Sequence, residues 1–261
     1  MAWKQFPYPD DAYVHTPQSL EAAWPRLHAG DVEAFPRQAA LVQAWLAFHA
    51  GDFERAVKLG LAIGVPGYAV AHKATCIYAT HLEVDDKQKL DMYEEVAERC
   101  ERQQNEQPDN PAGYYWHAYS LGRYALGTSV VKALAQGMGA RVRNSLDRTM
   151  TLAPMHAEAH IAFGIYHTEI IDKVGAMIGS LTYGANKDDG YQHFKTALAL
   201  TPYSALAHSE YARALNMLDG KKKLAEALAL YAKAAQCVAL DAKERLEVEA
   251  AIDELKESGI P

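Results

Sequence analysis

Residues 190–215 read GYQHFKTALALTPYSALAHSEYARAL, and this stretch decides the predicted fold. Its first half places Gly190 and Phe194 on one helix face and closes at Pro202. Its second half opens a new run of periodic apolar residues at Ala205. In helical repeats, small residues let paired helices approach, and a proline closes each unit because it cannot continue a helix. The stretch therefore predicts the second helix of one unit, a short turn and the first helix of the next.

The same start recurs at several places in the chain. Residues 69–72, 157–160 and 205–208 all read A-x-A-H, and residues 111–114 are a looser copy. A proline precedes each start, and the intervals between successive prolines are 42, 46 and 48 residues, for Pro66, Pro108, Pro154 and Pro202. These intervals exceed the period of about 34 residues that is typical of a tetratricopeptide unit. An insertion at residues 172–189 accounts for the excess in the last interval.

These residues resemble the tetratricopeptide repeat (TPR) family. The fourth unit supplies most of the family pattern, with His160, Phe163, Gly164, His167, Gly190, Phe194, Ala197 and Pro202. The resemblance covers roughly residues 37–239. It implies an all-α fold, a TPR-like right-handed superhelix of about five helix pairs with a C-terminal capping helix.

Two stretches resemble one branch of this family more closely. Residues 112–125 read AGYYWHAYSLGRYA, and residues 178–202 form a long insertion followed by a helix. Both look like the branch that includes bacterial TRAP-transporter T components and regulators of microtubule dynamics. The first residues carry no apolar export signal, so we expect a cytoplasmic protein, or a periplasmic one if an export signal has been removed.

The chain divides into three predicted regions. Residues 1–36 form an aromatic and proline-rich arm with a short helix, residues 37–240 form the repeat domain, and residues 241–261 form the capping helix. Within the repeat domain, Asn110 can cap the helix that Pro111 opens. The three-residue stretch 137–139, with two glycines, should break a helix.

Residues 172–189 are predicted to be irregular, with the next helix starting at Gly190. Their core, VGAMIGSLTYGA at residues 174–185, is apolar and rich in glycine. Left in water it would form an exposed apolar patch. We therefore expect it to cover a helix end, the mouth of the groove or a neighbouring subunit, which leaves a homo-oligomer open.

Composition excludes several classes of function. The chain has 261 residues and a net charge of −7, which argues against nucleic-acid binding through phosphate contacts. No apolar run approaches the roughly 20 residues of a membrane span. The three cysteines are far apart, so neither a zinc site nor a disulfide framework is indicated. No catalytic motif of the common hydrolases, nucleotide-binding enzymes or metalloproteases is present, so we expect no enzyme activity and no cofactor.

A histidine cluster offers an alternative that we weigh against packing. His156, His160 and His167 can share one helix face with Glu169, as metal ligands would. However, His72 and His208 occupy the same repeat position as His160. A position filled by histidine in three units is structural, so we expect no metal.

The repeat register predicts a binding groove on the concave face. It is lined by Trp45, Phe48, Lys73, Ile77, Tyr115, Tyr119, Arg123, Ile161, Ile165, Glu169 and Arg213. Aromatic residues with an arginine are typical of binding hot spots. The leading hypothesis is a non-catalytic scaffold that binds a protein or peptide segment there. The alternatives are a small-ligand accessory protein of a TRAP-type transporter, favoured by an enclosed pocket around Arg123, and an enzyme with an unrecognised site.

Overall fold

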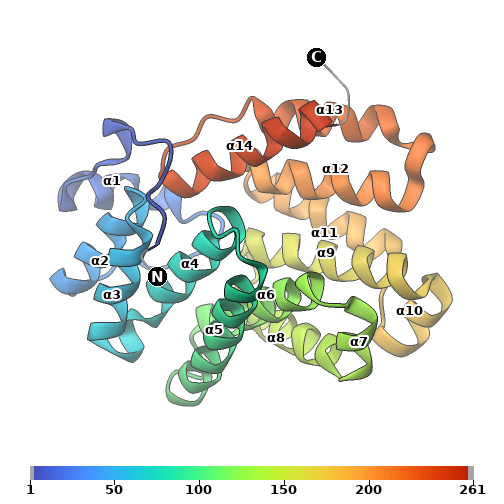
Figure 1. The fold of residues 1–261 in the computed structure, drawn as a ribbon, viewed down its shortest axis with the longest axis horizontal. Coiled ribbons are helices and arrows are strands. Elements are labelled where there is room, and N and C mark those ends of the chain that lie inside the picture. The colour runs from blue at the N-terminus through green and yellow to red at the C-terminus, as the bar shows by residue number, and fades with distance from the viewer. Residues whose placement is uncertain (1–2, 258–261) are drawn as a thin grey trace.

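The protein is all-helical in the computed structural model, which describes residues 3–257 and contains no strand in that range (Figure 1). The α-helices are α1 Pro17–Leu27, α2 Ala39–His49, α3 Phe53–Ile63, α4 Tyr68–His81, α5 Asp86–Glu106, α6 Pro111–Gly127, α7 Val130–Ala135, α8 Met138–Leu152, α9 Ala157–Val174, α10 Ala176–Tyr183, α11 Lys187–Leu200, α12 Ala205–Asp219, α13 Leu224–Ala235 and α14 Ala242–Glu257. Short 3-10 turns lie at Asp11–Tyr13, Val65–Gly67 and Gly220–Lys222. None of the helices in the described range is long and apolar enough to cross a bilayer.

Helices that follow one another in the chain pack against each other. Extensive contacts join α2 to α3, α4 to α5, α6 to α8, α9 to α11 and α12 to α13. In the chain, the short helix α7 comes between α6 and α8, and the short helix α10 comes between α9 and α11. The order of elements therefore brings α6, α7, α8 and α9 together in the middle of the chain (Figure 1).

Two helix boundaries confirm predictions made from single residues. The Asn110 side chain accepts a hydrogen bond from the backbone N–H of Ala112, and α6 begins at Pro111. Gly137 adopts a left-handed conformation with φ of 80°, and the helical structure is interrupted there between α7 and α8. Glycine has no Cβ to clash in this conformation, which explains its place at the break.

Residues 172–189 correct the prediction of an irregular stretch that ends at Gly190. Helix α9 continues to Val174, α10 fills most of the insertion, and α11 begins at Lys187. Gly175 separates α9 from α10, and Gly184 ends α10 in a left-handed conformation. The glycines therefore mark helix ends, whereas the sequence interpretation took them as signs of irregular chain.

The N-terminal arm packs on the body of the protein through its aromatic side chains. The Trp3 ring stacks on Tyr78 with centroids 4.0 Å apart, and Phe6 meets Phe53 edge to face at 6.4 Å. A Cβ at Gly51 would lie only 2.6 Å from the Phe6 ring, so this glycine makes room for the arm.

Helix α14 does more than cap the last pair. It packs on α12 and α13, and it also contacts α2 and α4 near the start of the chain. Ala242 and Leu246 belong to the same apolar cluster as Trp45 of α2. Figure 1 shows α14 running from the α1 end of the molecule towards α13. This helix therefore joins the two ends of the helical array.

Candidate functional site

The structure divides the predicted groove residues into two groups. The first group has buried side chains: Trp45, Phe48, Lys73, Ile77, Tyr115, Ile161 and Glu169. The second group is half-buried: Tyr119, Arg123, Ile165 and Arg213. Lys73 of the first group bonds Asp31 in the segment between α1 and α2, and Trp45 and Ile77 lie in one apolar cluster with Ala242 and Leu246 of α14. The second group keeps partial exposure.

An apolar cavity of about 100 Å³ lies next to that second group. It is partly open and lies between α6, α7, α8 and α9. Its walls include Ala118, Gly122, Leu126, Val130, Ala133, Leu134, Met138, Val142, Leu146, Ala162, Ile165, Tyr166 and Ile170. An apolar protein cavity of roughly 150 Å³ is known to bind benzene. The cavity therefore suits one ring or a short alkyl chain.

Small residues on α6 explain why the cavity exists. Ala118 and Gly122 are four residues apart, so they lie on the same face of the helix. A Cβ built on Gly122 meets no atom within 4 Å, which shows open space beside this residue. Ala162 on α9 contributes another small side chain to the wall. This spacing of small residues was a signal of the cavity that the sequence interpretation missed.

Charged side chains form one edge of the cavity. Arg123 and Glu169 line it, and Arg213 bonds Glu169 at 2.5 Å. Arg213 also donates to Glu210 at 2.8 Å, whereas Arg123 lies 3.6 Å from the same carboxylate. Burial by itself would raise the pKa of Glu210, but Arg213 and Arg123 outweigh it and the pKa is lowered. Two cations thus face two anions, and Arg123 is held less closely than Arg213.

The Arg123 side chain is oriented by an aromatic neighbour. Its guanidinium lies 5.3 Å from the centre of the Tyr119 ring, within the range of a cation–π contact. The Tyr119 hydroxyl is 2.8 Å from Thr80 Oγ1, which in turn is 2.9 Å from the Tyr93 hydroxyl. This chain of contacts fixes Tyr119 beneath Arg123 at the edge of the cavity.

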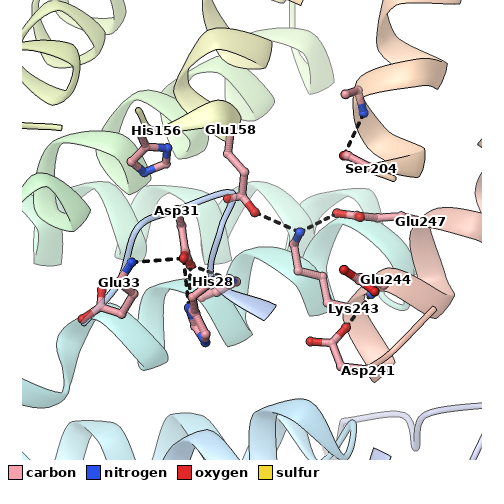
Figure 2. A network of polar contacts seen from close by, with 12 residues as sticks. His28, Asp31, Glu33, His156, Glu158, Ser204, Asp241, Lys243, Glu244 and Glu247 are labelled. Atoms are coloured by element: carbon pink, nitrogen blue, oxygen red, sulfur yellow. Dashed lines mark hydrogen bonds and ion pairs between the residues drawn. The ribbon is translucent and has the colours of Figure 1, made fainter. Parts of the chain in front are cut away.

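A second polar assembly contains His28, Asp31, His49, Lys73 and Asp241, and Figure 2 shows His28, Asp31 and Asp241 of this group. His28 Nδ1 is 2.9 Å from Asp31 Oδ1, and His49 Nδ1 is 2.8 Å from Asp241 Oδ2. The two rings meet through their Nε2 atoms at 3.2 Å. The buried Lys73 Nζ donates to Asp31 Oδ2 at 2.6 Å. All five side chains are at least nine-tenths buried.

The charges in this assembly shift one another's pKa values. Burial lowers the pKa of His28 to about 4. Burial alone would raise the pKa of Asp241, but the hydrogen bond and charge of His49 outweigh it, and the pKa falls to about 2. The pKa of Asp31 is likewise lowered well below its usual value, since His28 and Lys73 offset the effect of burial. Both carboxyl groups are therefore ionised at neutral pH.

A neighbouring ion-pair group ties α9 to α14. Lys243 bonds Glu158 at 2.9 Å and Glu247 at 2.8 Å, and Figure 2 shows its amine between the two carboxylates. Burial raises the pKa of Glu247 to about 7. A cavity of about 30 Å³, far smaller than the apolar one, adjoins Glu158 and Glu247. This group is a cross-link between helices more than a ligand site.

The histidines weighed as metal ligands each have another partner. His156 Nδ1 accepts the backbone N–H of Ala159 at the start of α9, and His167 Nδ1 accepts that of Asn186. His160 meets His193 at 2.9 Å. Within residues 3–257 no three or more His, Cys, Asp or Glu side chains gather in a way that could hold a metal ion.

Comparisons with known proteins add no identity. No protein-family model matches the sequence, and no curated protein matches it. The site therefore has to be interpreted from its own geometry.

Proposed function

We propose that the protein is a non-catalytic binding protein that holds a small, mostly apolar molecule in the cavity between α6 and α9. This proposal rests on the cavity, whose walls are apolar apart from the edge at Tyr119, Arg123 and Glu169. Apolar walls with a few convergent polar groups are the usual composition of small-molecule sites. Arg123, the less closely paired arginine, would meet an anionic group on the ligand.

The architecture we propose is a TPR-like superhelix. The packed helix pairs and the repeated A-x-A-H starts support five repeat units, although intervals above 40 residues are long for this family. The small-ligand function agrees with the resemblance to T components of TRAP transporters. We prefer it over peptide binding in the predicted groove because Trp45, Phe48, Tyr115 and most of the other predicted groove residues are buried.

Filling the cavity from Gly122 tests the proposal. Gly122→Phe adds a ring where a Cβ has open space, and Gly122→Ala is the matched control that leaves the cavity almost unchanged. Toluene and phenylacetate are titrated by calorimetry into each variant, with circular dichroism to check folding. We expect both to bind the wild type and Gly122→Ala, and neither to bind Gly122→Phe. Equal binding by all three proteins would refute the cavity as the site.

Two further variants complete this test. Arg123→Met should lose phenylacetate and keep toluene, because it removes the cation and leaves the apolar walls. Ala162→Leu fills the cavity from α9 and replaces Gly122→Phe if that variant fails to fold. If neither probe binds the folded wild type at millimolar concentration, the proposed function is wrong.

A second candidate function, contact with a protein partner, rests on α10. Met177, Ile178 and Leu181 are 76%, 54% and 82% exposed, and residues 174–186 carry no charged side chain. Exposed apolar patches of this kind mark interaction surfaces. Sedimentation velocity of the wild type and of a Met177→Ser/Leu181→Ser variant tests whether the patch joins two copies of the chain, because only the wild type would then form a dimer.

A further inference from the structure

We infer that His28 and His49 share one proton and form a pH-sensitive latch, which holds the segment between α1 and α2 (residues 28–38) on the body of the protein. The hydrogens on the four ring nitrogens of His28 and His49 follow from their hydrogen-bond partners. Each Nδ1 atom faces an ionised carboxylate, so each Nδ1 carries a hydrogen and donates it. The contact between the two Nε2 atoms, at 3.2 Å, needs one hydrogen between them. Three hydrogens on four nitrogens give the pair a single positive charge.

The shared proton balances the charge of the assembly. Asp31 and Asp241 are negative, while Lys73 and the histidine pair are positive. One Nε2 atom donates this hydrogen to the other, and the charge balance is the same whichever ring carries it. Other charged or titratable groups around the pair are His15 in the N-terminal arm, His156 and Glu158 at the start of α9, Lys243 at the start of α14, and Glu33 in the segment itself. Burial and the charge of Asp31 raise the pKa of Glu33 to about 7, so its protonation at lower pH favours the closed segment.

A second proton breaks this arrangement. Both Nε2 atoms would then carry hydrogens, and neither could accept from the other across 3.2 Å. Two positive rings would also face each other in a buried site, where charge is costly. The contact must open, and His28 leaves with the segment that carries it. Burial lowers the pKa of His28 to about 4 in the closed segment, below the ordinary histidine value of 6.5. The open state therefore binds more protons, and opening becomes more favourable as the pH falls.

The segment is also strained in a way that favours opening. Val32 has φ of 49°, a left-handed conformation that β-branched residues rarely adopt. The closed segment is held by other bonds as well, since Gly30 O accepts the backbone N–H of Glu158 and Trp24 Nε1 donates to Glu33 O. The His28 ring stacks on Trp24 with centroids 3.7 Å apart. The latch therefore holds a segment whose backbone would relax on release.

Nitrogen NMR counts the hydrogens directly. Spectra of ¹⁵N-histidine protein at pH 7.5, assigned with His28→Gln and His49→Gln variants, should show three protonated nitrogens and one bare nitrogen for the pair. Two protonated nitrogens, one on each ring, would overturn the shared proton.

Hydrogen exchange of the intact protein measures the latch. In a Glu33→Gln background, which removes the opposing titration of Glu33, the opening of residues 28–38 should increase about tenfold for each pH unit between 6.5 and 4, after correction for intrinsic rates. The His28→Gln/His49→Gln variant keeps amide hydrogen bonds without a titrating ring and should lose this dependence. His117→Gln, which replaces another buried histidine, should keep it. Protection of residues 28–38 that is the same at pH 7.5 and 5 in the Glu33→Gln protein would overturn the latch.

Val32→Asn provides a second variant if the double glutamine variant does not fold. Asparagine tolerates the left-handed conformation better than valine, and Val32 is 41% exposed, so a polar side chain fits there. Opening of residues 28–38 should decrease at every pH while its slope with pH stays the same. An increase in opening would show that strain does not contribute, and a changed slope would contradict the proton count.

Discussion

Replacement of Lys73 by methionine tests how strongly the buried ion pair holds the fold. The Lys73 side chain is 2% exposed, and its amine donates to Asp31 at 2.6 Å. Methionine keeps most of the apolar stem, which lies near the rings of Trp45 and Phe48. The substitution therefore removes the charge with little loss of packing.

The expected loss of unfolding free energy depends on the charge of Asp31, which remains buried after Lys73 is replaced. Breaking a buried pair by removing one partner typically costs about 3–5 kcal/mol, because the other charge is left uncompensated. Asp31 keeps a contact with His28 and accepts the backbone N–H of Glu33 at 3.3 Å. We therefore expect the lower end, about 3 kcal/mol, out of a total unfolding free energy of about 5–15 kcal/mol.

The matched control is Lys58→Met. Lys58 bonds Glu54 at 2.7 Å, nearly the same distance, but its side chain is 71% exposed. An exposed pair of this spacing contributes only about 0.3–0.5 kcal/mol. Urea unfolding followed by circular dichroism at pH 7.5 measures both variants. A loss below about 1 kcal/mol for Lys73→Met, equal to that of the control, would refute the view that the buried pair matters.

Three other predictions concern packing, pH and the surface. Gly164→Ala should lower the free energy of unfolding by about 1–3 kcal/mol, because its Cβ would lie 2.5 Å from the Phe194 ring; thermal unfolding checks this. Urea unfolding at pH 7 and pH 5 should show lower stability at pH 5. Burial lowers the pKa of His81 to about 3 and of His193 to about 4, so the unfolded chain binds more protons below 6.5. Leu181→Ser should change the free energy of unfolding by less than about 0.5 kcal/mol, since this side chain is exposed, and a larger loss would place it in a packed contact.

Much of the secondary structure was predictable from local signals. Asn110 and Pro111 mark the start of α6, and Gly137 marks the break before α8, because capping and backbone conformation depend on neighbouring residues. Helix α10 was missed because its glycines lower helix propensity. Gly179 faces α9, where a Cβ would make an ordinary contact with Ile170 at 3.4 Å.

The site was far less predictable, because its parts meet only after folding. His49 and Asp241 are 192 residues apart, and Asp31 and Lys73 are 42 apart. The repeat register placed Trp45 on an inner face, but no local pattern indicates that α14 returns to cover it. The cavity depends on the lack of a side chain at Gly122. Sequence motifs for binding sites consist of side chains that are present, so they do not indicate such a space.

The return of α14 has a consequence for how the molecule unfolds. In an open solenoid each repeat contacts only its neighbours, so terminal repeats can fray while central ones stay folded. Here the last helix is bonded to the first ones through Glu244 with Arg26 and Asp241 with His49. Neither terminus can melt without loosening the other. The chain should therefore behave as one cooperative unit, and shortening it at the carboxyl end should weaken helices at the amino end as well as α12 and α13.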